Sequence, residues 1–138
     1  MAVNCLKEKA GAESVGQSIL DAGGQAAVFP CDVRNSCAVR EMVGQIVSRW
    51  GCLDILINNA GLSRDRTLLK MVDSEWTDVI ETNLNGTFYC LREAALVMAR
   101  RKRGVIINVA SYRAFRPSDN IADRLPERQD GWCWSSGE

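Results

Sequence analysis

The sequence predicts an α/β fold, in which helices cover both faces of a parallel sheet. Short apolar segments alternate with helical patterns four times before residue 112. The clearest segment, residues 53–57, ends abruptly in two asparagines followed by Ala60 and Gly61. Short apolar runs bounded by turn residues are typical of strands buried on both faces. Strands that alternate with helices form parallel sheets joined by right-handed crossovers.

The elements follow from the local patterns in chain order. Strands are predicted at residues 2–5, 26–31, 53–57 and 104–111, and helices at residues 7–22, 36–50 and 74–101. Asn35 or Ser36 can cap the second helix, and Gly51 can end it. Asp73 or Ser74 can cap the third.

The third helix has an apolar face that runs from Trp76 to Met98 and includes Phe88. Asn85 and Gly86 interrupt this pattern, so we expect the helix to weaken or bend at that point.

The composition excludes several functions. Seventeen basic and seventeen acidic side chains cancel, so we expect no nucleic-acid or membrane-surface partner. The six cysteines form no C-x-x-C pair and the chain has no histidine, so we expect no metal site. No apolar run approaches the ~20 residues that span a bilayer. Thiols without a signal peptide favour a cytoplasmic location.

Polar side chains follow the predicted strands, where ligands of open α/β sheets lie. Asn58 and Asn59 end the third strand, and Ala60 and Gly61 leave room for a ligand to approach the backbone. Ser111 ends the fourth strand, where its hydroxyl could donate to a substrate carbonyl oxygen. A serine that only begins a turn is the alternative.

Asp32 and Asn83 each allow two interpretations. Asp32 could bind the amino group or ribose of a nucleotide, or it could cap the next helix. Asn83 lies on the apolar face of the third helix, where a buried amide without a partner costs about 1–3 kcal/mol. It must therefore bind water or a local carbonyl. A distorted helix with a satisfied polar residue explains the spacing equally well.

Taken together, the sequence resembles the short-chain dehydrogenase/reductase family, and within it the beta-ketoacyl-acyl-carrier-protein reductases. The segments that carry the resemblance are 31–33 (CDV), 53–61 (LDILINNAG), 75–76 (EW), 81–84 (ETNL) and 106–111 (IINVAS). This ordered set is far more specific than any single motif. It implies a partial Rossmann-like, doubly wound parallel sheet and an enzyme that reduces a carbonyl with hydride from NAD(P)H, here in fatty acid biosynthesis.

The resemblance also implies roles for eight residues. In the cofactor site, Asp32 and Val33 flank the adenine, and the lining residues are Asn58, Asn59, Ala60 and Gly61. In catalysis, Asn83 holds a water of the proton relay and Ser111 orients the substrate carbonyl. Asn4 and Cys5 provide no acid after the first strand, which slightly favours NADP over NAD.

The sequence departs from the family at both ends. The family's first strand and its glycine-rich pyrophosphate turn are not matched. That strand is central, so the first and third strands here are expected either to pair or to take a second chain between them. The family's Tyr-x-x-x-Lys positions hold Arg124 and Arg128, and arginine releases no proton near neutral pH. Tyr112 has the wrong spacing, with Arg116 four residues on.

The expected organisation is a partial NAD(P)-binding domain at residues 1–112 and an irregular tail at residues 113–138, in a truncated or frame-shifted product of a longer reductase gene. The expected function is reduction of a small-molecule carbonyl or acyl thioester, by a chain that is catalytically incomplete. The alternative is a non-catalytic remnant that at most pairs with a full-length relative. The helix at residues 74–101 is the expected contact in a homo-oligomer.

Overall fold

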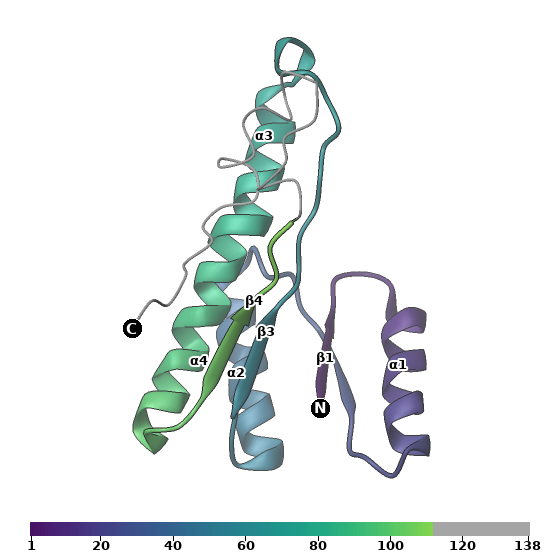
Figure 1. Cartoon of the computed structure of the whole chain (residues 1–138), viewed down its shortest axis with the longest axis vertical. Coiled ribbons are helices and arrows are strands. Elements are labelled where there is room, and N and C mark those ends of the chain that lie inside the picture. The colour runs from purple at the N-terminus through teal and green to yellow at the C-terminus, as the bar shows by residue number, and fades with distance from the viewer. Residues whose placement is uncertain (112–138) are drawn as a thin grey trace.

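The computed structural model describes residues 1–111 and has the predicted alternation of strands and helices (Figure 1). The strands are β1 (Ala2–Cys5), β2 (Ala27–Pro30), β3 (Ile55–Asn58) and β4 (Val105–Asn108). The helical elements are α1 (Lys9–Asp21), α2 (Ser36–Trp50), η1 (Leu68–Lys70), α3 (Asp73–Val79), η2 (Ile80–Gly86) and α4 (Thr87–Arg101). The four predicted strands and three predicted helical regions are confirmed. The expected tail, with Tyr112, Arg116, Arg124 and Arg128, lies outside the described residues.

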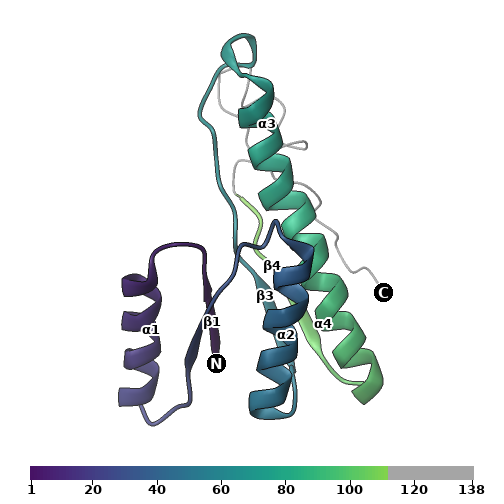
Figure 2. The same ribbon diagram turned by 180° about the vertical axis from the view of Figure 1, so that it is seen from behind.

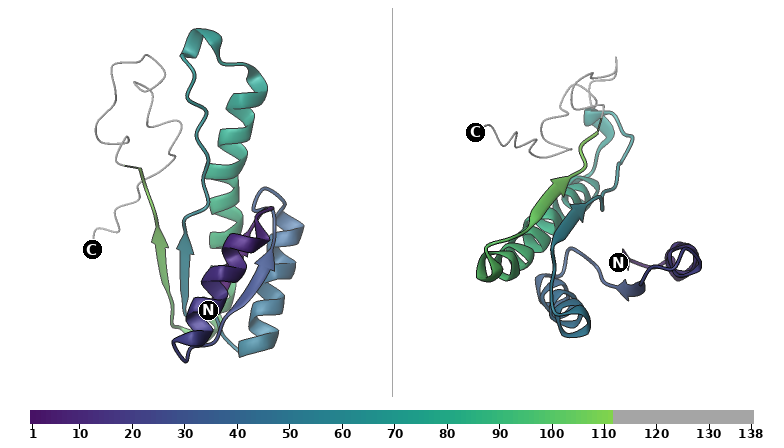
Figure 3. Two further views of the ribbon diagram at one scale, coloured as in Figure 1. Left: turned by 90° about the vertical axis from the view of Figure 1, so that its right-hand side faces the viewer. Right: turned by 60° about the horizontal axis from the view of Figure 1, so that its bottom comes forward.

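The strands form two separate parallel pairs instead of one sheet. β1 pairs with β2, starting at Ala2 opposite Ala27, and β3 pairs with β4, ending at Asn58 opposite Asn108. Within residues 1–111, β1 and β3 do not pair, so the possibility that the first and third strands join is wrong. Figure 3 shows the interval between the two pairs.

Helix α2 contacts both pairs of strands. In the rear view of Figure 2 it lies in front of β3. Its Trp50 packs edge-on against Phe29 of β2, with ring centroids 5.9 Å apart, and its Val39 belongs to the core cluster that Leu56 of β3 packs against. Within residues 1–111 the two pairs are therefore connected through side chains of α2 and share no backbone ladder.

Helices lie on both faces of β2, as the sequence predicts. Val28 faces α1, because a Cβ on Gly16 would lie 3.7 Å from its Cγ2. Phe29, the next residue, faces α2 through Trp50. Successive side chains of a strand point to opposite faces, so α1 and α2 cover opposite sides.

The core lies between α2, α4 and the strands. Its buried cluster contains Cys31, Val33, Val39 and Cys90, and Val39 is fully buried. On the opposite face of the β3–β4 pair, the exposed side chains are Ile55, Ile57, Val105, Ile107 and Val109.

The ends of α2 match their sequence signals, whereas the start of α3 does not. The Asn35 side chain accepts hydrogen bonds from the N–H groups of Cys37 and Ala38, and Gly51 ends the helix at a φ of 75°. The prediction that Asp73 or Ser74 caps α3 is wrong, because Asp73 is already helical and Val72 precedes it. Valine has no capping oxygen, and Glu75 instead accepts the Val72 N–H at 3.3 Å.

The predicted bend in the third helical region takes the form of the π-helical segment η2. A wider turn rotates the residues that follow it about the helix axis. Gly86 is buried at the end of η2, and the buried residues beyond it are Cys90, Glu93, Ala94 and Met98. Phe88, which the regular pattern places in the core, is 52% exposed.

Residues 1–111 contain neither a membrane-spanning helix nor a cluster of metal ligands. None of the helices there combines the length and the apolar character needed to cross a membrane. No group of three metal-ligating side chains comes together there either.

Gly86 lies where η2 packs against the segment after β2. A Cβ at this position would lie 2.8 Å from Cγ2 of Val33, whereas a Cβ at Gly44 in α2 would meet nothing within 4 Å. We expect Gly86→Ala to lower the free energy of unfolding by about 1–3 kcal/mol because of this overlap. Gly44→Ala should raise it by about 0.5–1 kcal/mol. Urea unfolding of both variants tests the packing, and equal effects would contradict it.

Burial raises the pKa of the Cys90 thiol to about 11. In the unfolded chain a thiol ionises near pH ~8.5, so the unfolded state loses its proton first as the pH rises. The free energy of unfolding should therefore fall between about pH 9 and pH 11. Urea unfolding across this range should show a smaller fall for Cys90→Ala than for the parent chain. Cys37→Ala, at an exposed thiol, is the control and should keep the parent's dependence.

Candidate active site

The pairing of β3 with β4 determines one edge of the candidate site. At the carboxyl ends of these strands, Asn58 Nδ2 donates to Asn108 Oδ1 at 2.9 Å. The Val109 N–H donates to the Asn58 carbonyl at 2.9 Å. Asn59 follows β3 directly and is exposed. Ser111 does not end the fourth strand as expected, because β4 ends at Asn108 and Ser111 comes three residues later. The structure therefore places the predicted amide and hydroxyl groups at the same edge of one pair of strands.

The Asn83 side chain binds the backbone that follows β3. Its Oδ1 accepts the Leu62 N–H at 2.9 Å, and its Nδ2 donates to the Leu62 carbonyl at 3.0 Å. A Cβ at Gly61 would lie 3.5 Å from the same Oδ1. Of the partners that the sequence allowed, the structure shows a backbone carbonyl, although one that is 21 residues away. Two predicted site segments are thus in direct contact.

The backbone carbonyl of Asn83 in η2 also accepts a side-chain hydrogen bond. Thr87 Oγ1 donates to the Asn83 carbonyl at 2.7 Å. Threonine hydroxyls commonly bind the carbonyl four residues earlier in a helix. Sequence reasoning missed both Thr87 and Leu62. The four-residue spacing could have indicated Thr87, but no local signal indicates Leu62.

Asp32 follows β2 and does not cap α2, because Asn35 does. Its carboxylate binds Arg34 instead: Arg34 Nη2 lies 2.7 Å from Asp32 Oδ2, and the Arg34 N–H lies 3.0 Å from Oδ1. These hydrogen bonds, chiefly those from the Arg34 side chain, hold the pKa of the Asp32 carboxyl below its usual range. The alternative of Asp32 as a helix cap is therefore wrong. The sequence analysis did not predict the pairing with Arg34.

Val33 is buried in the core, unlike the neighbouring Asp32. Its side chain is 8% exposed and packs under Gly86 in the core. It can therefore meet a ligand only through its backbone, and its side chain joins the segment after β2 to η2.

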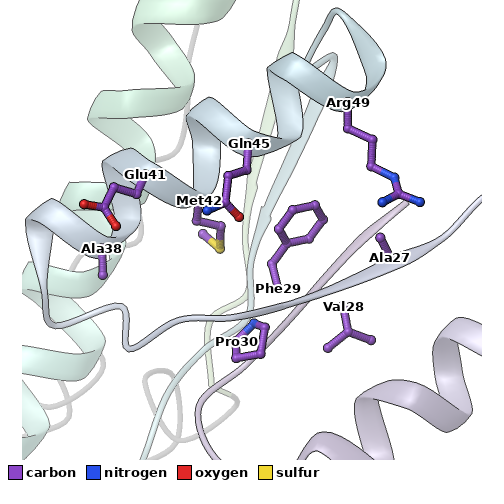
Figure 4. A pocket seen from close by; sticks show the side chains of 9 residues that line it. All are labelled: Ala27, Val28, Phe29, Pro30, Ala38, Glu41, Met42, Gln45 and Arg49. Carbon is purple, nitrogen blue, oxygen red and sulfur yellow. The ribbon is translucent and has the colours of Figure 1, made fainter.

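The structure also has a cavity of about 200 Å³ between β2 and α2 (Figure 4). Phe29 and Met42 give it an apolar wall, and Glu41 and Arg49 of α2 lie along its side. None of the predicted site residues lines it. The cavity is therefore separate from the edge that holds Asn59 and Ser111.

The described residues fit the two ends of a dinucleotide. Asp32 offers a carboxylate for an amino or hydroxyl group, and the exposed segment Asn59, Ala60 and Gly61 lets a flat ring approach the backbone. Within residues 1–111 no helix begins at a glycine-rich turn, since α1, α2 and α3 follow Glu8, Asn35 and Val72. These residues therefore do not supply the usual cradle for a pyrophosphate.

Comparisons with known proteins identify the family. The family model described as short chain dehydrogenase matches residues 1–122, and the chain belongs to this family. A 3-oxoacyl-(acyl-carrier-protein) reductase of Staphylococcus aureus is 40% identical over 111 residues, which cover 80% of this chain and 45% of that protein. The corresponding reductase of Synechocystis is 34% identical over 109 residues, which cover 79% of this chain and 44% of that protein. The chain thus spans about half the length of these relatives.

A solved structure confirms the fold. A short chain dehydrogenase from Burkholderia cenocepacia, in complex with NADP, matches with a TM-score of 0.82. The match covers 93% of this chain and 51% of that chain, at 24% sequence identity. The predicted α/β, Rossmann-like class is confirmed.

The contact between Asn83 and Leu62 can be tested directly. Asn83→Ala removes both hydrogen bonds to the Leu62 backbone, so we expect the free energy of unfolding to fall by about 1–3 kcal/mol. Amide exchange at Leu62 should become faster. Thr77→Ala, at an exposed side chain of α3, is the control and should change stability by less than about 0.5 kcal/mol. Unchanged exchange at Leu62 in Asn83→Ala would contradict the contact.

Proposed function

We propose that the chain carries the adenine-side and substrate-side residues of an NAD(P)H-dependent reductase for 3-oxoacyl thioesters or similar carbonyls. Residues 1–112 form its partial NAD(P)-binding domain. The proposal rests on family membership and on one observation. The segment after β3, the end of β4 and the π-helical segment η2 converge, with Asn83 bound to Leu62 beside Gly61.

Each residue has a role that its position supports. The hydroxyl of Ser111, three residues after β4, donates a hydrogen bond to the substrate carbonyl oxygen as negative charge develops on it. Asn59, Ala60 and Gly61 line the nicotinamide end, and Asn58 supports them through Asn108. Asp32 and the backbone of Val33 contact the adenine end. The bound nicotinamide cofactor supplies the hydride.

Asn83 contributes to the path by which a proton reaches the substrate. Its side chain is engaged with Leu62, so its contribution to a proton path comes through its carbonyl, which already accepts from Thr87 Oγ1. A carbonyl oxygen has two lone pairs and can accept a water beside that hydroxyl.

The chain is proposed to be catalytically incomplete by itself. The family's proton donor is a tyrosine, and the matching positions hold Arg124 and Arg128. A positioned general acid contributes about 10²–10⁴-fold to the rate, so reduction without one is slow.

Further properties follow from the same proposal. The absence of an acidic residue at Asn4 and Cys5 favours NADP over NAD. The five described cysteines are free, which supports a reducing, cytoplasmic location. Phe88 and Leu96 of α4 are 52% and 55% exposed, and this face is the proposed contact between copies in a homo-oligomer.

Cofactor binding by the full 138-residue chain is the first test. We expect saturable quenching or enhancement of fluorescence on titration with NADPH, and weaker binding of NADH. Asp32→Ala and Asn59→Ala should each weaken NADPH binding by about 3–10-fold, equivalent to about 0.7–1.4 kcal/mol. Ser63→Ala, in the polar loop beyond the site, is the control.

Reduction of an acetoacetyl thioester by the same chain separates the two functional candidates. NADPH binding without measurable turnover supports the incomplete reductase. Turnover that Ser111→Ala abolishes would show the chain to be a complete catalyst. A folded chain that binds no nicotinamide cofactor would instead be the non-catalytic remnant. The lack of pairing between β1 and β3 within the described residues favours this alternative.

A further inference from the structure

Arg34 connects two separate parts of the candidate site. Its Nε lies 3.0 Å and 3.1 Å from the two carboxylate oxygens of Asp32, and its Nη2 lies 2.7 Å from Oδ2. Its Nη1 also lies 3.5 Å from Oδ1 of Asp78 in α3. One planar guanidinium therefore binds a carboxylate after β2 and a second carboxylate 44 residues further along the chain.

Asp78 extends this chain of contacts to the segment after β3. Its Oδ2 lies 3.0 Å from Nη2 of Arg64. The four side chains Asp32, Arg34, Asp78 and Arg64 alternate in charge and are called the Arg34 network below. Lys7 and Glu81 are the other charged groups that act on its first pair.

The Arg34 network connects the two pairs of strands, and its small contribution to folding stability does not explain this location. All four side chains are 32–43% exposed, and exposed ion pairs contribute only about 0–1 kcal/mol to folding. In the part of the chain that the structure describes, however, the two pairs of strands share no backbone ladder. The network bridges their carboxyl ends, on which the proposed cofactor site depends.

We propose that Arg34 is a positioning residue for the cofactor, which holds the Asp32 carboxylate in one orientation relative to α3. The inference rests on the proposed function. Arginine suits this role because its rigid fork fixes both carboxylate oxygens at once, which a lysine cannot do. The fixed carboxylate still has lone pairs to accept the amino group of an adenine ring.

Four variants and one ligand fragment test the proposal. ADP-ribose carries the adenosine end and lacks the nicotinamide, so its binding does not depend on the nicotinamide end of the site. Arg34→Gln should weaken ADP-ribose binding about 5–10-fold, and Asp78→Asn, which removes one anchor of the guanidinium, about 2–3-fold. Arg34→Lys should recover only part of the loss. Arg66→Gln is the matched control, because Arg66 makes a similar ion pair with Glu75 of α3, at 3.1 Å, outside the network.

A second measurement does not need a ligand. The side-chain carboxyl carbon of Asp32, followed by NMR, should shift in Asp78→Asn if Arg34 transmits the position of α3, and should not shift in Arg66→Gln. Arg34→Gln should move the pKa of Asp32 up towards its ordinary value, since the Arg34 side chain is the main cause of its lowering.

The outcomes distinguish this inference from the proposed function. If the parent chain binds no ADP-ribose, the proposed function fails, and the carboxyl resonance alone decides whether Arg34 couples Asp32 to α3. If the parent binds and Arg34→Gln binds equally well, only the positioning role is overturned. Equal losses in Arg34→Gln and Arg66→Gln would also overturn it, because they would indicate a general loss of surface charge.

Discussion

The register of β3 against β4 is the constraint on which the candidate site depends. Residues opposite one another in this pair run from Ile55 with Val105 to Asn58 with Asn108. A slip of one residue in a strand moves each side chain to the other face. It would also separate the backbone positions from which Asn59 and Ser111 extend. The position of every polar group at this edge therefore follows from one choice of register.

The apolar pattern alone specifies that register weakly. Leu56 packs against the core, but Ile55 and Ile57 on the other face are equally apolar, so a slipped strand would still present hydrophobic side chains to the core. The hydrogen bond from Asn58 to Asn108 differs in this respect, because it forms in one register only. A polar contact at the end of the pair thus supplies the specificity that the apolar side chains lack.

The π-helical segment η2 then joins this edge to the other pair of strands. Gly86 packs on Val33 after β2, and Asn83 binds Leu62 after β3. An ordinary α-helix through the same residues would present a different set of side chains to the strands, because π-helical turns are wider. The distortion that Asn85 and Gly86 signal in the sequence is therefore what allows one helix to contact both strand ends.

The sequence was sufficient for the features that depend on neighbouring residues. The apolar runs, the cap at Asn35 and the stop at Gly51 each involve residues within a few positions, and all were predicted. The partner of Asn83 lies 21 residues away, and Asp78 lies 44 residues from Arg34. Such contacts exist only once the elements have packed, so no local pattern indicates them. Phe88 was misplaced because helical periodicity assumes a uniform turn, which η2 does not have.

The separation of the two strand pairs changes which interactions position the site. A two-stranded sheet is marginally stable by itself, and one face of the β3–β4 pair presents exposed apolar side chains, among them Ile57, which is 57% exposed. Burial on a single face contributes about half of what a strand covered on both faces would gain, because the hydrophobic contribution scales with the apolar area removed from water. Side-chain contacts that would be secondary in a fully covered sheet therefore become decisive. The amide pair at Asn58, the Asn83 contact and the Arg34 network all lie at the carboxyl ends of the strands. The proposed function requires the side chains at these ends to be held in fixed positions.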